Sequence, residues 1–380
     1  MATEAPLRGL ENVVVASTRL SAIDGTAGRL SYAGFDIHDL AERACFEEVV
    51  FLLWYGELPR AAELHDFSAR LVAARQLGTA ELALVRSLPA SGHGMDALRT
   101  LVSGLALLDA HADDTSAAGA ERIGVRIVAQ MPVLIAAWDR LRRGLDPVAP
   151  DPALPHAANF LYMLRGVAPG AAEARAFEGY MVLLAEHGLN ASTFAARVAI
   201  GSQADVYCAV VAAIGTLKGL LHGGANQKAM EAFLAIGMPE RAGEYIEQLL
   251  ARQGRLMGVG HRIYKVEDPR VRHLRRYVQQ LAQGGASNWQ EVADAVARVV
   301  AEHPHFTRRQ LNPNVEFYSA PLLYMLDLPL DLFTAAFALS RVAGWVGHIA
   351  EQLADNRLIR PKADYHGPAR RGYVALDQRG

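Results

Sequence analysis

The amino-acid sequence predicts a nearly all-α fold with a small β-ribbon near the N-terminus. Apolar residues recur at helical spacing over most of the chain, and the alternation of strands and helices that marks an α/β protein is missing. Short β-prone segments are confined to residues 12–37. With 380 residues, 51% of them hydrophobic, the chain is long enough for about two domains and can bury a large core without disulfides or a metal.

The predicted β-ribbon consists of short segments separated by turn residues. Val13-Val14-Val15 comes first, and Ile23-Asp24-Gly25 and Gly28-Arg29-Leu30-Ser31-Tyr32 follow it. Because Asp-Gly favours tight turns, these segments predict a ribbon rather than an extended sheet.

Helical periodicity begins at residue 46. The first predicted helix has four apolar residues on one face and ends before a glycine and a proline: Val49, Val50, Leu53, Trp54, Gly56 and Pro59. The same spacing predicts helices within residues 242–250, 289–300 and 333–353. Alanine-rich residues 116–137 and 191–214 permit close packing between helices.

Two segments interrupt this pattern. Residues 146–155 contain proline at four of ten positions, which excludes a helix there. Such a segment is typical of a domain boundary or of a surface loop between two helices. Residues 284–288 form a second break, which precedes a predicted helix and does not indicate a domain boundary.

Composition excludes several classes of function. The formal net charge of −2 argues against a nucleic-acid-binding surface. No apolar run approaches the roughly 20 residues needed to span a membrane, and residues 1–9 lack the apolar core of a signal peptide. Cys45 and Cys208 are too few for a secreted disulfide framework, so we expect a cytoplasmic protein.

The common catalytic motifs are also missing from the sequence. There is no P-loop, no His-Glu-x-x-His and no Gly-x-Ser-x-Gly, and residues 258–263 lack the third glycine of a dinucleotide-binding motif. His303-Pro304-His305 has no nearby carboxylate or thiol, so it is more typical of a surface turn than of a metal site. We therefore expect neither a metal nor a cofactor.

His222 lies in an unusual backbone setting. It precedes Gly223-Gly224 and a predicted helix over residues 225–236. At a helix N-terminus the helix dipole disfavours the imidazolium and keeps the ring neutral, so that it can donate a hydrogen bond to a developing oxyanion. A histidine that merely caps the helix fits the sequence equally well.

His261 and Arg270 form a second candidate site. His261 follows Gly258 and Gly260, whose missing side chains allow a ligand to approach the backbone. Asp268 is a good N-cap and Pro269 suits the first helical position, so Arg270 is expected in the first helical turn. A cation opposes the helix dipole there, which indicates either an anionic ligand or a solvated side chain.

Three further ionisable residues complete the candidates. Glu316 lies in the apolar and aromatic stretch Asn314-Val315-Glu316-Phe317-Tyr318, a setting that raises a carboxyl pKa and suits proton transfer. Arg341 lies within an apolar helix and needs an anion or a carboxylate partner. Arg360 by itself is typical of a solvated tail. Together the histidines, the acid and the arginines predict an acid/base site for a small polycarboxylate.

These residues, in this order, resemble the citrate synthase family over most of the chain. The matching motifs are Ile23-Asp24-Gly25 with Gly28-Arg29-Leu30, residues 46–59, Met95-Asp96-x-Leu98-Arg99-Thr100, residues 190–197, Leu221-His222-Gly223-Gly224-Ala225-Asn226, Gly258-Val259-Gly260-His261-Arg262 with Asp268-Pro269-Arg270, residues 314–319, and Gly344-Trp345 with His348, Glu351 and Gln352.

The resemblance implies an almost all-helical homodimer in which a small domain closes over the substrates. We expect residues 1–222 and 322–380 to form the large domain and residues 223–321 the small one. The implied reaction condenses acetyl-CoA with oxaloacetate to give citrate and CoA, with no nucleic-acid or membrane partner. The chain resembles the short dimeric bacterial or archaeal type, without the NADH inhibition of longer members.

The resemblance also implies a role for each site residue. His222 would stabilise the enol of the thioester, His261 would protonate the oxaloacetate carbonyl, and Glu316 would be the catalytic base. His187, Arg270 and Arg341 would bind oxaloacetate, and Arg360 would reach in from the partner subunit. Ser192 would orient His222, while Lys265 and Arg309 match positions that hold CoA phosphates.

Two alternatives remain open at this stage. One is a 2-methylcitrate synthase, which uses propionyl-CoA, because one methylene in an apolar pocket is worth only about 1–3 kcal/mol. The other is a weakly active or non-catalytic paralogue, because the family usually has Asp where this chain has Glu316. The extra methylene moves the carboxylate by roughly 1 Å, which can cost about a hundredfold in rate.

Overall fold

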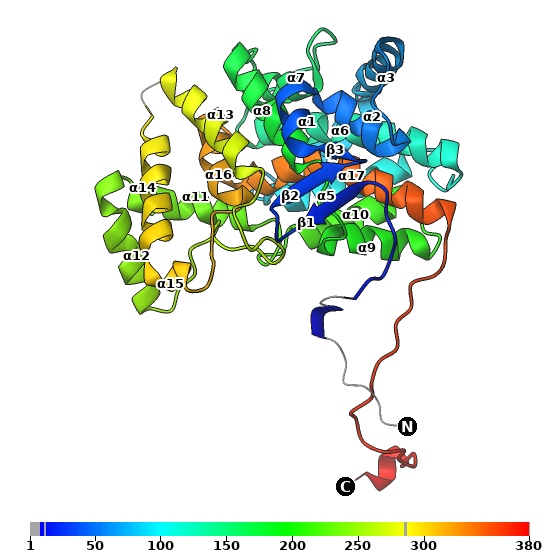
Figure 1. The fold of residues 1–380 in the computed structure, drawn as a ribbon. Helices are drawn as coiled ribbons and strands as arrows, with labels where there is room; N and C mark the ends of the chain where they lie inside the picture. Colours follow the sequence, from blue (N-terminus) through cyan, green and yellow to red (C-terminus); the bar gives the residue numbers. More distant parts are fainter. Residues whose placement is uncertain (1–7, 11–12, 285–286, 380) are drawn as a thin grey trace.

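The structure, a computed structural model, describes residues 8–10, 13–284 and 287–379. Within these ranges the chain forms a helical body with one small antiparallel sheet (Figure 1). The all-α fold with an N-terminal β-ribbon is therefore confirmed. The elements are β1 (Ser21–Asp24), β2 (Arg29–Tyr32), β3 (Phe35–Asp36), α1 (Ile37–Arg43), α2 (Phe46–Tyr55), α3 (Ala61–Ala74), α4 (Thr79–Ser87), α5 (Gly94–Leu107), α6 (Ala117–Arg142), α7 (His156–Arg165), α8 (Ala171–Leu184), α9 (Ala191–Gly201), α10 (Val206–Leu217), α11 (Ala225–Ile236), α12 (Ala242–Ala251), α13 (Val271–Gln283), α14 (Trp289–Glu302), α15 (Pro304–Thr307), α16 (Val315–Met325) and α17 (Phe333–Ala354).

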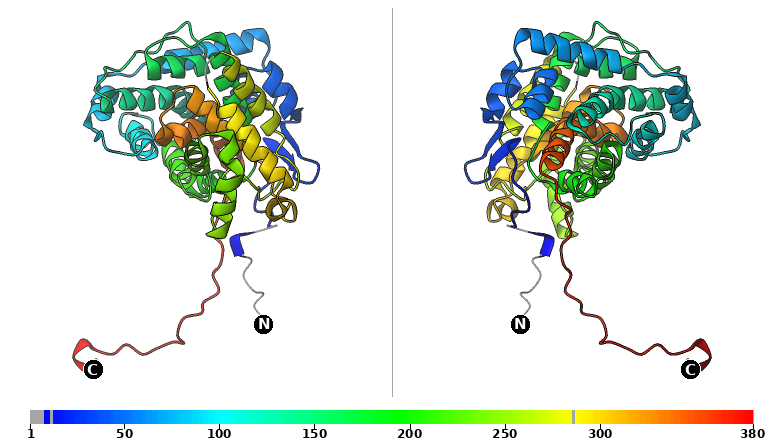
Figure 2. Two further views of the ribbon diagram at one scale, coloured as in Figure 1. Left: turned by 90° about the vertical axis from the view of Figure 1, so that its left-hand side faces the viewer. Right: turned by 90° about the vertical axis from the view of Figure 1, so that its right-hand side faces the viewer.

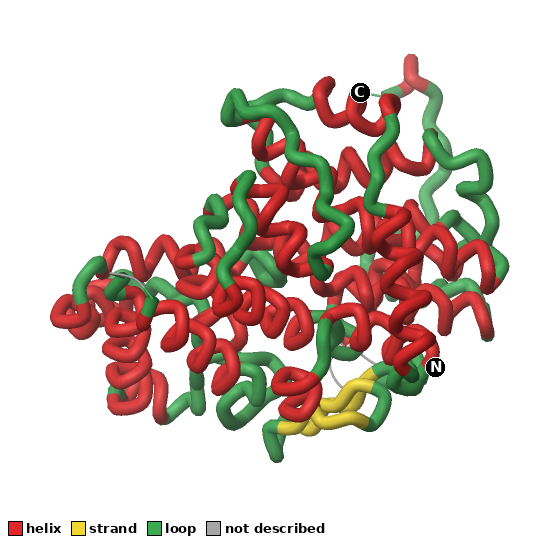
Figure 3. The backbone as a smooth tube through the Cα atoms, turned by 90° about the horizontal axis from the view of Figure 1, so that it is seen from above, coloured by secondary structure: helices red, strands yellow, loops and turns green. Residues whose placement is uncertain are grey.

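The sheet has the strand order β1-β2-β3 and lies at one edge of the body (Figure 3). Ser21 pairs with Tyr32 and Asp24 with Arg29, so the strands flank a turn over residues 25–28. The prediction was wrong for Val13-Val14-Val15, which has no regular structure. Val14 is highly exposed and has no neighbouring strand to complete a ladder, so its β-propensity alone does not make a strand.

The core is centred on α6 and α17, which pack against each other through the middle of the body (Figures 1 and 2). The expectation that no apolar run is long enough to span a membrane needs correction. Residues Leu330–Ala354 are long and apolar enough by length and composition, with a mean hydropathy of 1.2. The most apolar 18 consecutive residues of this segment are all buried by neighbouring elements, as in the central helix of a protein core.

Helices α11 to α16 gather at one side of the molecule (Figure 1), where α13 and α16 pack against α8 of the main body. Helices α11 to α15 lie within residues 223–321, the segment expected to form the small domain, and α16 begins inside this segment but ends beyond it at Met325. The division into two domains stays a prediction. Residues 146–155 form the loop between α6 and α7. Of the break at residues 284–288, Gly285 and Ala286 lie outside the described residues.

After α17 the chain runs as an extended tail over residues 355–375 and ends in a short 3₁₀ turn, Leu376–Gln378. The tail leaves the body on the same side as the described N-terminal residues (Figures 1 and 2). Tyr365, Tyr373 and Leu376 are all more than 70% exposed on it.

Candidate active site

Most of the predicted site residues lie on segments that connect helices. His187 lies between α8 and α9, His222 in the turn before α11, and His261 in the long loop between α12 and α13. Glu316 is in the first turn of α16, and Arg341 is in the middle of the buried helix α17. The helices thus act as a scaffold, and the connecting segments bring the titratable groups together.

His222 is held by Ser192 in the first turn of α9. Ser192 Oγ lies 2.8 Å from His222 Nε2 and also 2.8 Å from Asn190 Oδ1, and it accepts a hydrogen bond from Trp345 Nε1 at 3.2 Å. Ser192 has one hydroxyl hydrogen for two acceptors. When the hydroxyl donates to Nε2, the proton of the neutral ring lies on Nδ1; when it donates to Asn190, His222 carries its proton on Nε2. The serine therefore sets the tautomer of His222.

His261 has its tautomer fixed by the backbone. Its Nδ1 accepts hydrogen bonds from the N–H groups of Ile263 and Tyr264, at 3.0 and 3.1 Å. The proton of the neutral ring must then lie on Nε2, which makes no hydrogen bond within the described part of the chain. The His261 ring lies edge-on to His187 at 5.5 Å, and His187 Nε2 is 3.1 Å from the hydroxyl of Tyr264.

Arg270 is buried and already paired. Its Nε and Nη2 donate to the two carboxylate oxygens of Asp268 at 2.9 and 2.7 Å, and both side chains are 2% exposed or less. The predicted helix start was wrong by two residues, because α13 begins at Val271 with Arg270 as its N-cap. The Asp268 carboxylate accepts the N–H of Arg270 and forms a turn ahead of the helix. This pair orients the guanidinium rather than leaving it in solvent.

Arg341 is as deeply buried but has no such partner. Its Nε donates to the backbone oxygen of Leu184 at 2.7 Å, and its guanidinium lies 4.9 Å from the ring centre of Phe337. No carboxylate of the described residues lies within 4 Å of it. A buried guanidinium that is not neutralised costs several kcal/mol, so this position calls for an anion.

The segments that carry Glu316 and His261 are joined by main-chain hydrogen bonds. Gly260 N donates to Asn312 O at 2.7 Å, and Asn314 N donates to Gly258 O at 2.9 Å. The Asn314 side chain caps α16 through the N–H of Glu316 and donates to Gly260 O at 2.8 Å. Gly258 has a φ of 83° and lies so close to Phe317 that an added Cβ would be 3.0 Å from its Cα. These contacts tie the segment of His261, the proposed acid, to the segment of Glu316, the proposed base.

Electrostatics keeps the histidines neutral. Desolvation, and then Arg341, lowers the pKa of His222 to about 4, and desolvation, and then Arg270, does the same for His261. Burial, and then Arg270 and Arg341, lowers the pKa of His187 well below its usual range. Desolvation raises the pKa of Glu316, although Arg270 acts in the opposite direction. Near neutral pH the three imidazoles are hydrogen-bond donors, and the carboxylate is a stronger base than usual.

The remaining predicted residues lie at the surface. Lys265 is exposed in the loop of His261, and its charge is among those that lower the pKa of His261. Arg309 is exposed just after α15, with its Nη1 3.4 Å from His305 Nε2. Arg360 is exposed in the extended tail after α17, and within the described part of the chain it makes no hydrogen bond or ion pair with the other predicted site residues.

Sequence reasoning missed three residues that shape the site. Tyr264 contacts His187, Tyr32 hydrogen-bonds the backbone at Leu183 and Glu186, and buried Glu186 contacts His348 Nε2 at 3.1 Å. The only local signal was their position, since Glu186 directly precedes His187 and Tyr264 follows His261 by three residues.

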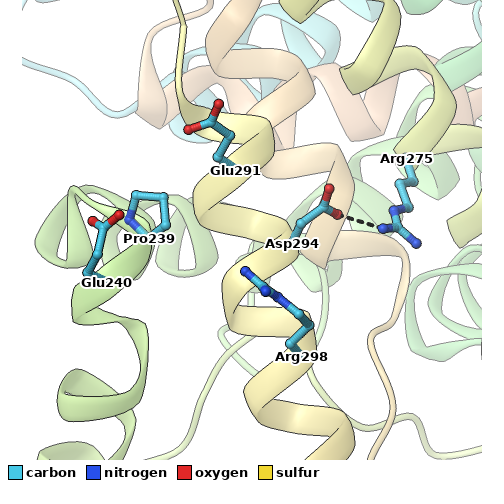
Figure 4. Close-up of a pocket in the computed structure, with 6 residues that line it drawn as sticks. All are labelled: Pro239, Glu240, Arg275, Glu291, Asp294 and Arg298. Atoms are coloured by element: carbon cyan, nitrogen blue, oxygen red, sulfur yellow. Dashed lines mark ion pairs between the residues drawn. The ribbon is translucent and has the colours of Figure 1, made fainter.

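A separate surface hollow of about 500 Å³ lies between the 3₁₀ turn at Pro239–Arg241, α13 and α14 (Figure 4). Its charged lining residues include Glu240, Glu291 and Arg298, and Arg275 forms an ion pair with Asp294 at 3.0 Å. None of the predicted site residues lines it. Among the described residues, no group of three or more His, Cys, Asp and Glu side chains could hold a metal ion.

Comparison with known proteins gives a consistent result. The family model for the citrate synthase C-terminal domain matches residues 9–362. A citrate synthase of Haloferax volcanii is 44% identical over 98% of both chains, and a 2-methylcitrate synthase of Mycobacterium tuberculosis is 42% identical over 96% of this chain and 91% of its own length.

Solved structures show the same fold. A citrate synthase of Pyrobaculum aerophilum matches with a TM-score of 0.91 and 41% identity, covering 98% of this chain and 95% of that one. The ternary complex of carboxymethyl coenzyme A and oxaloacetate with the citrate synthase of Thermoplasma acidophilum matches with a TM-score of 0.92 and 29% identity, covering 99% and 100%. Because the family model matches nearly all of this chain, the chain belongs to the citrate synthase family.

Proposed function

We propose that this enzyme condenses acetyl-CoA with oxaloacetate and releases citrate and CoA. The observation that carries the proposal is the buried guanidinium of Arg341, which forms no ion pair within 4 Å among the described residues and lies near Arg270 and three neutral histidines. This arrangement suits a small dianion whose carbonyl is to be polarised. A relative of the same fold was solved with oxaloacetate and a coenzyme A analogue, which supports the same pair of ligands here.

Arg270, Arg341 and His187 bind oxaloacetate in this proposal. A guanidinium binds a carboxylate through two parallel hydrogen bonds and so fixes its orientation as well as its position. Arg270 is pre-oriented by Asp268, and Arg341 by the backbone oxygen of Leu184. Arg360 of the partner subunit would add a further guanidinium to this site in a homodimer, because Arg360 is exposed on a tail that runs away from its own body (Figure 1).

Deprotonation of the acetyl group falls to Glu316 and His222. A thioester α-carbon is a very weak acid, so the carboxylate of Glu316 removes its proton only if the oxygen that becomes negative is stabilised at the same time. His222 does so by donating from Nδ1, which requires Ser192 to donate to Nε2. The N–H of Ser192, which can only donate, is 3.3 Å from the same nitrogen and favours that tautomer.

Bond formation and release complete the reaction. The enol carbon attacks the ketone of oxaloacetate, and His261 Nε2 gives its proton to the ketone oxygen as the carbon–carbon bond forms. Water then cleaves the thioester of citryl-CoA, giving the new carboxylate and CoA thiol. Of the two water protons, one ends on the CoA thiol and the other restores His261, while Glu316 releases to solvent the proton it took from the acetyl group. Besides water and the two substrates, this sequence uses only the chain's own acids and bases. Closure of the segment 223–321 would exclude water until the bond has formed.

The second candidate is 2-methylcitrate formation from propionyl-CoA. It is favoured by a specific observation, since a relative with that name is nearly as similar to this chain as a citrate synthase is. A weakly active paralogue is the third, because of Glu316. The decisive assay measures free thiol released from acetyl-CoA or propionyl-CoA with oxaloacetate present. Higher kcat/KM with propionyl-CoA would reject the first function, and no thiol release from either would reject both.

The assembly and location belong to the same proposal. A homodimer would cover the exposed Tyr365, Tyr373 and Leu376 of the tail and complete each site with Arg360. Lys265 and Arg309, both exposed, would bind the phosphates of CoA. The free thiols of Cys45 and Cys208 suit a reducing cytoplasm. Sedimentation should give a dimer, and Arg360→Ala should raise the KM for oxaloacetate.

A further inference from the structure

The hairpin formed by β1 and β2 contacts both loops that carry the oxaloacetate-binding histidines. We propose that this hairpin is a positioning element, whose strands hold the loop of His187 and whose turn holds the loop of His261. The inference rests on the proposed function, because it assigns the two loops to one substrate. It concerns residues 21–32, none of which carries a catalytic group.

The strands of the hairpin hold the segment around His187. Tyr32 Oη lies 3.0 Å from Leu183 O and 2.9 Å from Glu186 O, and Ser21 Oγ donates to Glu186 Oε1 at 2.9 Å. Ser21 Oγ also accepts the N–H of Gly188 at 3.1 Å. These bonds flank His187 on both sides.

The strands are themselves rigidly attached to the core. Leu30 and Tyr32 of β2 and Leu20, the residue before β1, are 1% exposed or less, and Leu20 fills the space beside Gly347 of α17. Because the hairpin is packed against α17, its turn has a fixed position relative to the core, and so do the residues that the turn contacts.

The turn of the hairpin holds the segment after His261. Gly25 O accepts the N–H of Lys265 at 2.9 Å, and Asp24 Oδ1 shapes the turn by accepting from Thr26 and Ala27. Gly25 packs directly on Ile263: an added Cβ would clash with the Ile263 carbonyl oxygen and lie 2.9 Å from its carbonyl carbon. These atoms belong to main chain, which cannot rotate away as a side chain can.

The contacts of the strands and the contacts of the turn are connected to each other through Ile263 and Tyr264. Ile263, which meets Gly25 through its carbonyl, also donates its N–H to His261 Nδ1. Tyr264, the next residue, reaches back to His187. A shift of the turn would therefore move both the ring of His261 and the hydroxyl that contacts His187. Misplacement by about 1 Å can cost about a hundredfold in rate, so a small displacement is measurable.

The test replaces Gly25 by alanine. We expect Gly25→Ala to weaken oxaloacetate binding, measured by calorimetry, by about tenfold to a hundredfold and to speed amide hydrogen exchange at Lys265. Exchange in α17 should stay unchanged, which shows that the fold is intact. Tyr32→Phe, which keeps the buried ring and removes the hydroxyl, should weaken oxaloacetate binding in the same direction but less.

Gly243→Ala is the matched control, because Gly243 is in α12 and an added Cβ there has no atom within 4 Å. It should leave binding and exchange unchanged. If Gly25→Ala matches this control in oxaloacetate affinity and in Lys265 exchange, the inference is overturned. If wild type binds oxaloacetate but releases no thiol from acetyl-CoA or propionyl-CoA, the proposed function fails, while the effect of Gly25→Ala on binding still decides the inference.

Discussion

Two buried polar clusters in this molecule look alike electrostatically and differ in geometry. One is the candidate active site, and the other, called the α2/α7 cluster, consists of Glu47, Arg75 and His156. Burial, and then Arg75, lowers the pKa of His156 to about 3, compared with about 4 for His222 and His261. Each cluster also contains a buried arginine whose pKa burial lowers, Arg75 in one and Arg341 in the other. A shifted pKa alone therefore does not mark a catalytic group.

The hydrogen bonds separate the two clusters. Glu47 Oε1 accepts the N–H of His156 at 2.8 Å and lies 3.9 Å from Arg75 Nη2, so the arginine has its carboxylate. Neither ring nitrogen of His156 has a hydrogen-bond partner among the described residues, and the ring packs 5.3 Å from Phe46. In the active site, by contrast, one nitrogen of each of His222 and His261 is held. Orientation by a partner, with the second nitrogen left for substrate, distinguishes catalysis from packing.

The largest expected effect is the loss of His222. We expect His222→Ala to lower kcat/KM by about 10²–10⁴-fold, because the oxygen of the forming enolate loses its donor. The melting temperature should change little, since the ring is only partly buried. His156→Phe, which removes an equally neutral imidazole from the α2/α7 cluster, should retain wild-type turnover. Equal losses of turnover in the two variants would mean that position in the site does not matter.

Glu316→Asp tests whether the site is built around the longer acid. The shorter side chain withdraws the carboxylate by roughly 1 Å, so we expect kcat to fall by about a hundredfold. The segment of Asn312 and Asn314 fixes the backbone at this position and leaves it little freedom to compensate. A large gain in kcat would instead favour the weakly active paralogue. Steady-state thiol release at saturating substrates gives the answer.

Local patterns could predict the fold and most of the acid/base groups. The helix at Phe46–Tyr55 follows from its apolar spacing, and Gly56 ends it with a φ of 85°, as the sequence indicated. Asn190, Ser192 and His222 belong to motifs that are close together in the chain or match the family. The helix and its end are visible in the sequence because they depend on neighbours within a turn or two of helix. The contact between Ser192 and His222 spans 30 positions, and only the resemblance to the family indicated it.

The supporting contacts could not be predicted in the same way. Tyr264 meets His187 across 77 positions, and Tyr32 meets Leu183 across 151. Nothing in the residues around Tyr32 distinguishes a hydroxyl that braces a loop from one that faces solvent. Helix propensity predicted Asp268 as an N-cap. Both of its carboxylate oxygens instead pair with the buried guanidinium of Arg270, and the helix begins later, at Val271. The residues that support the candidate site groups from behind are brought there by tertiary packing, which local propensity does not encode.

Arg341→Lys and Arg75→Lys test whether the two buried arginines have different roles. An ammonium keeps the charge but loses the planar fork, so we expect the KM for oxaloacetate to rise about tenfold to a hundredfold, as for one charged hydrogen bond of about 1.5–3 kcal/mol. Arg75→Lys, in the α2/α7 cluster, should lower the melting temperature and leave KM unchanged. Its Nη1 hydrogen bond to Leu154 O holds only a loop. A raised KM in Arg75→Lys would contradict the comparison.

The smallest effect concerns stability and leaves activity untouched. The pKa of His156 is about 3 in the folded protein and 6.5 in an unfolded chain, so below pH 6.5 the unfolded state binds a proton that the folded state excludes. Stability is therefore lost as pH falls from 6.5 towards 3, by about 1.4 kcal/mol per pH unit, or about 2 kcal/mol at pH 5. His156→Phe should remove this slope while the ring contact with Phe46 is kept. Urea unfolding between pH 7 and 5 measures it, with the exposed His65→Phe as control. If the free energy of unfolding has the same pH dependence in wild type and His156→Phe, the α2/α7 cluster admits a proton in the folded state. The contrast with the candidate active site would then rest on hydrogen-bond geometry alone.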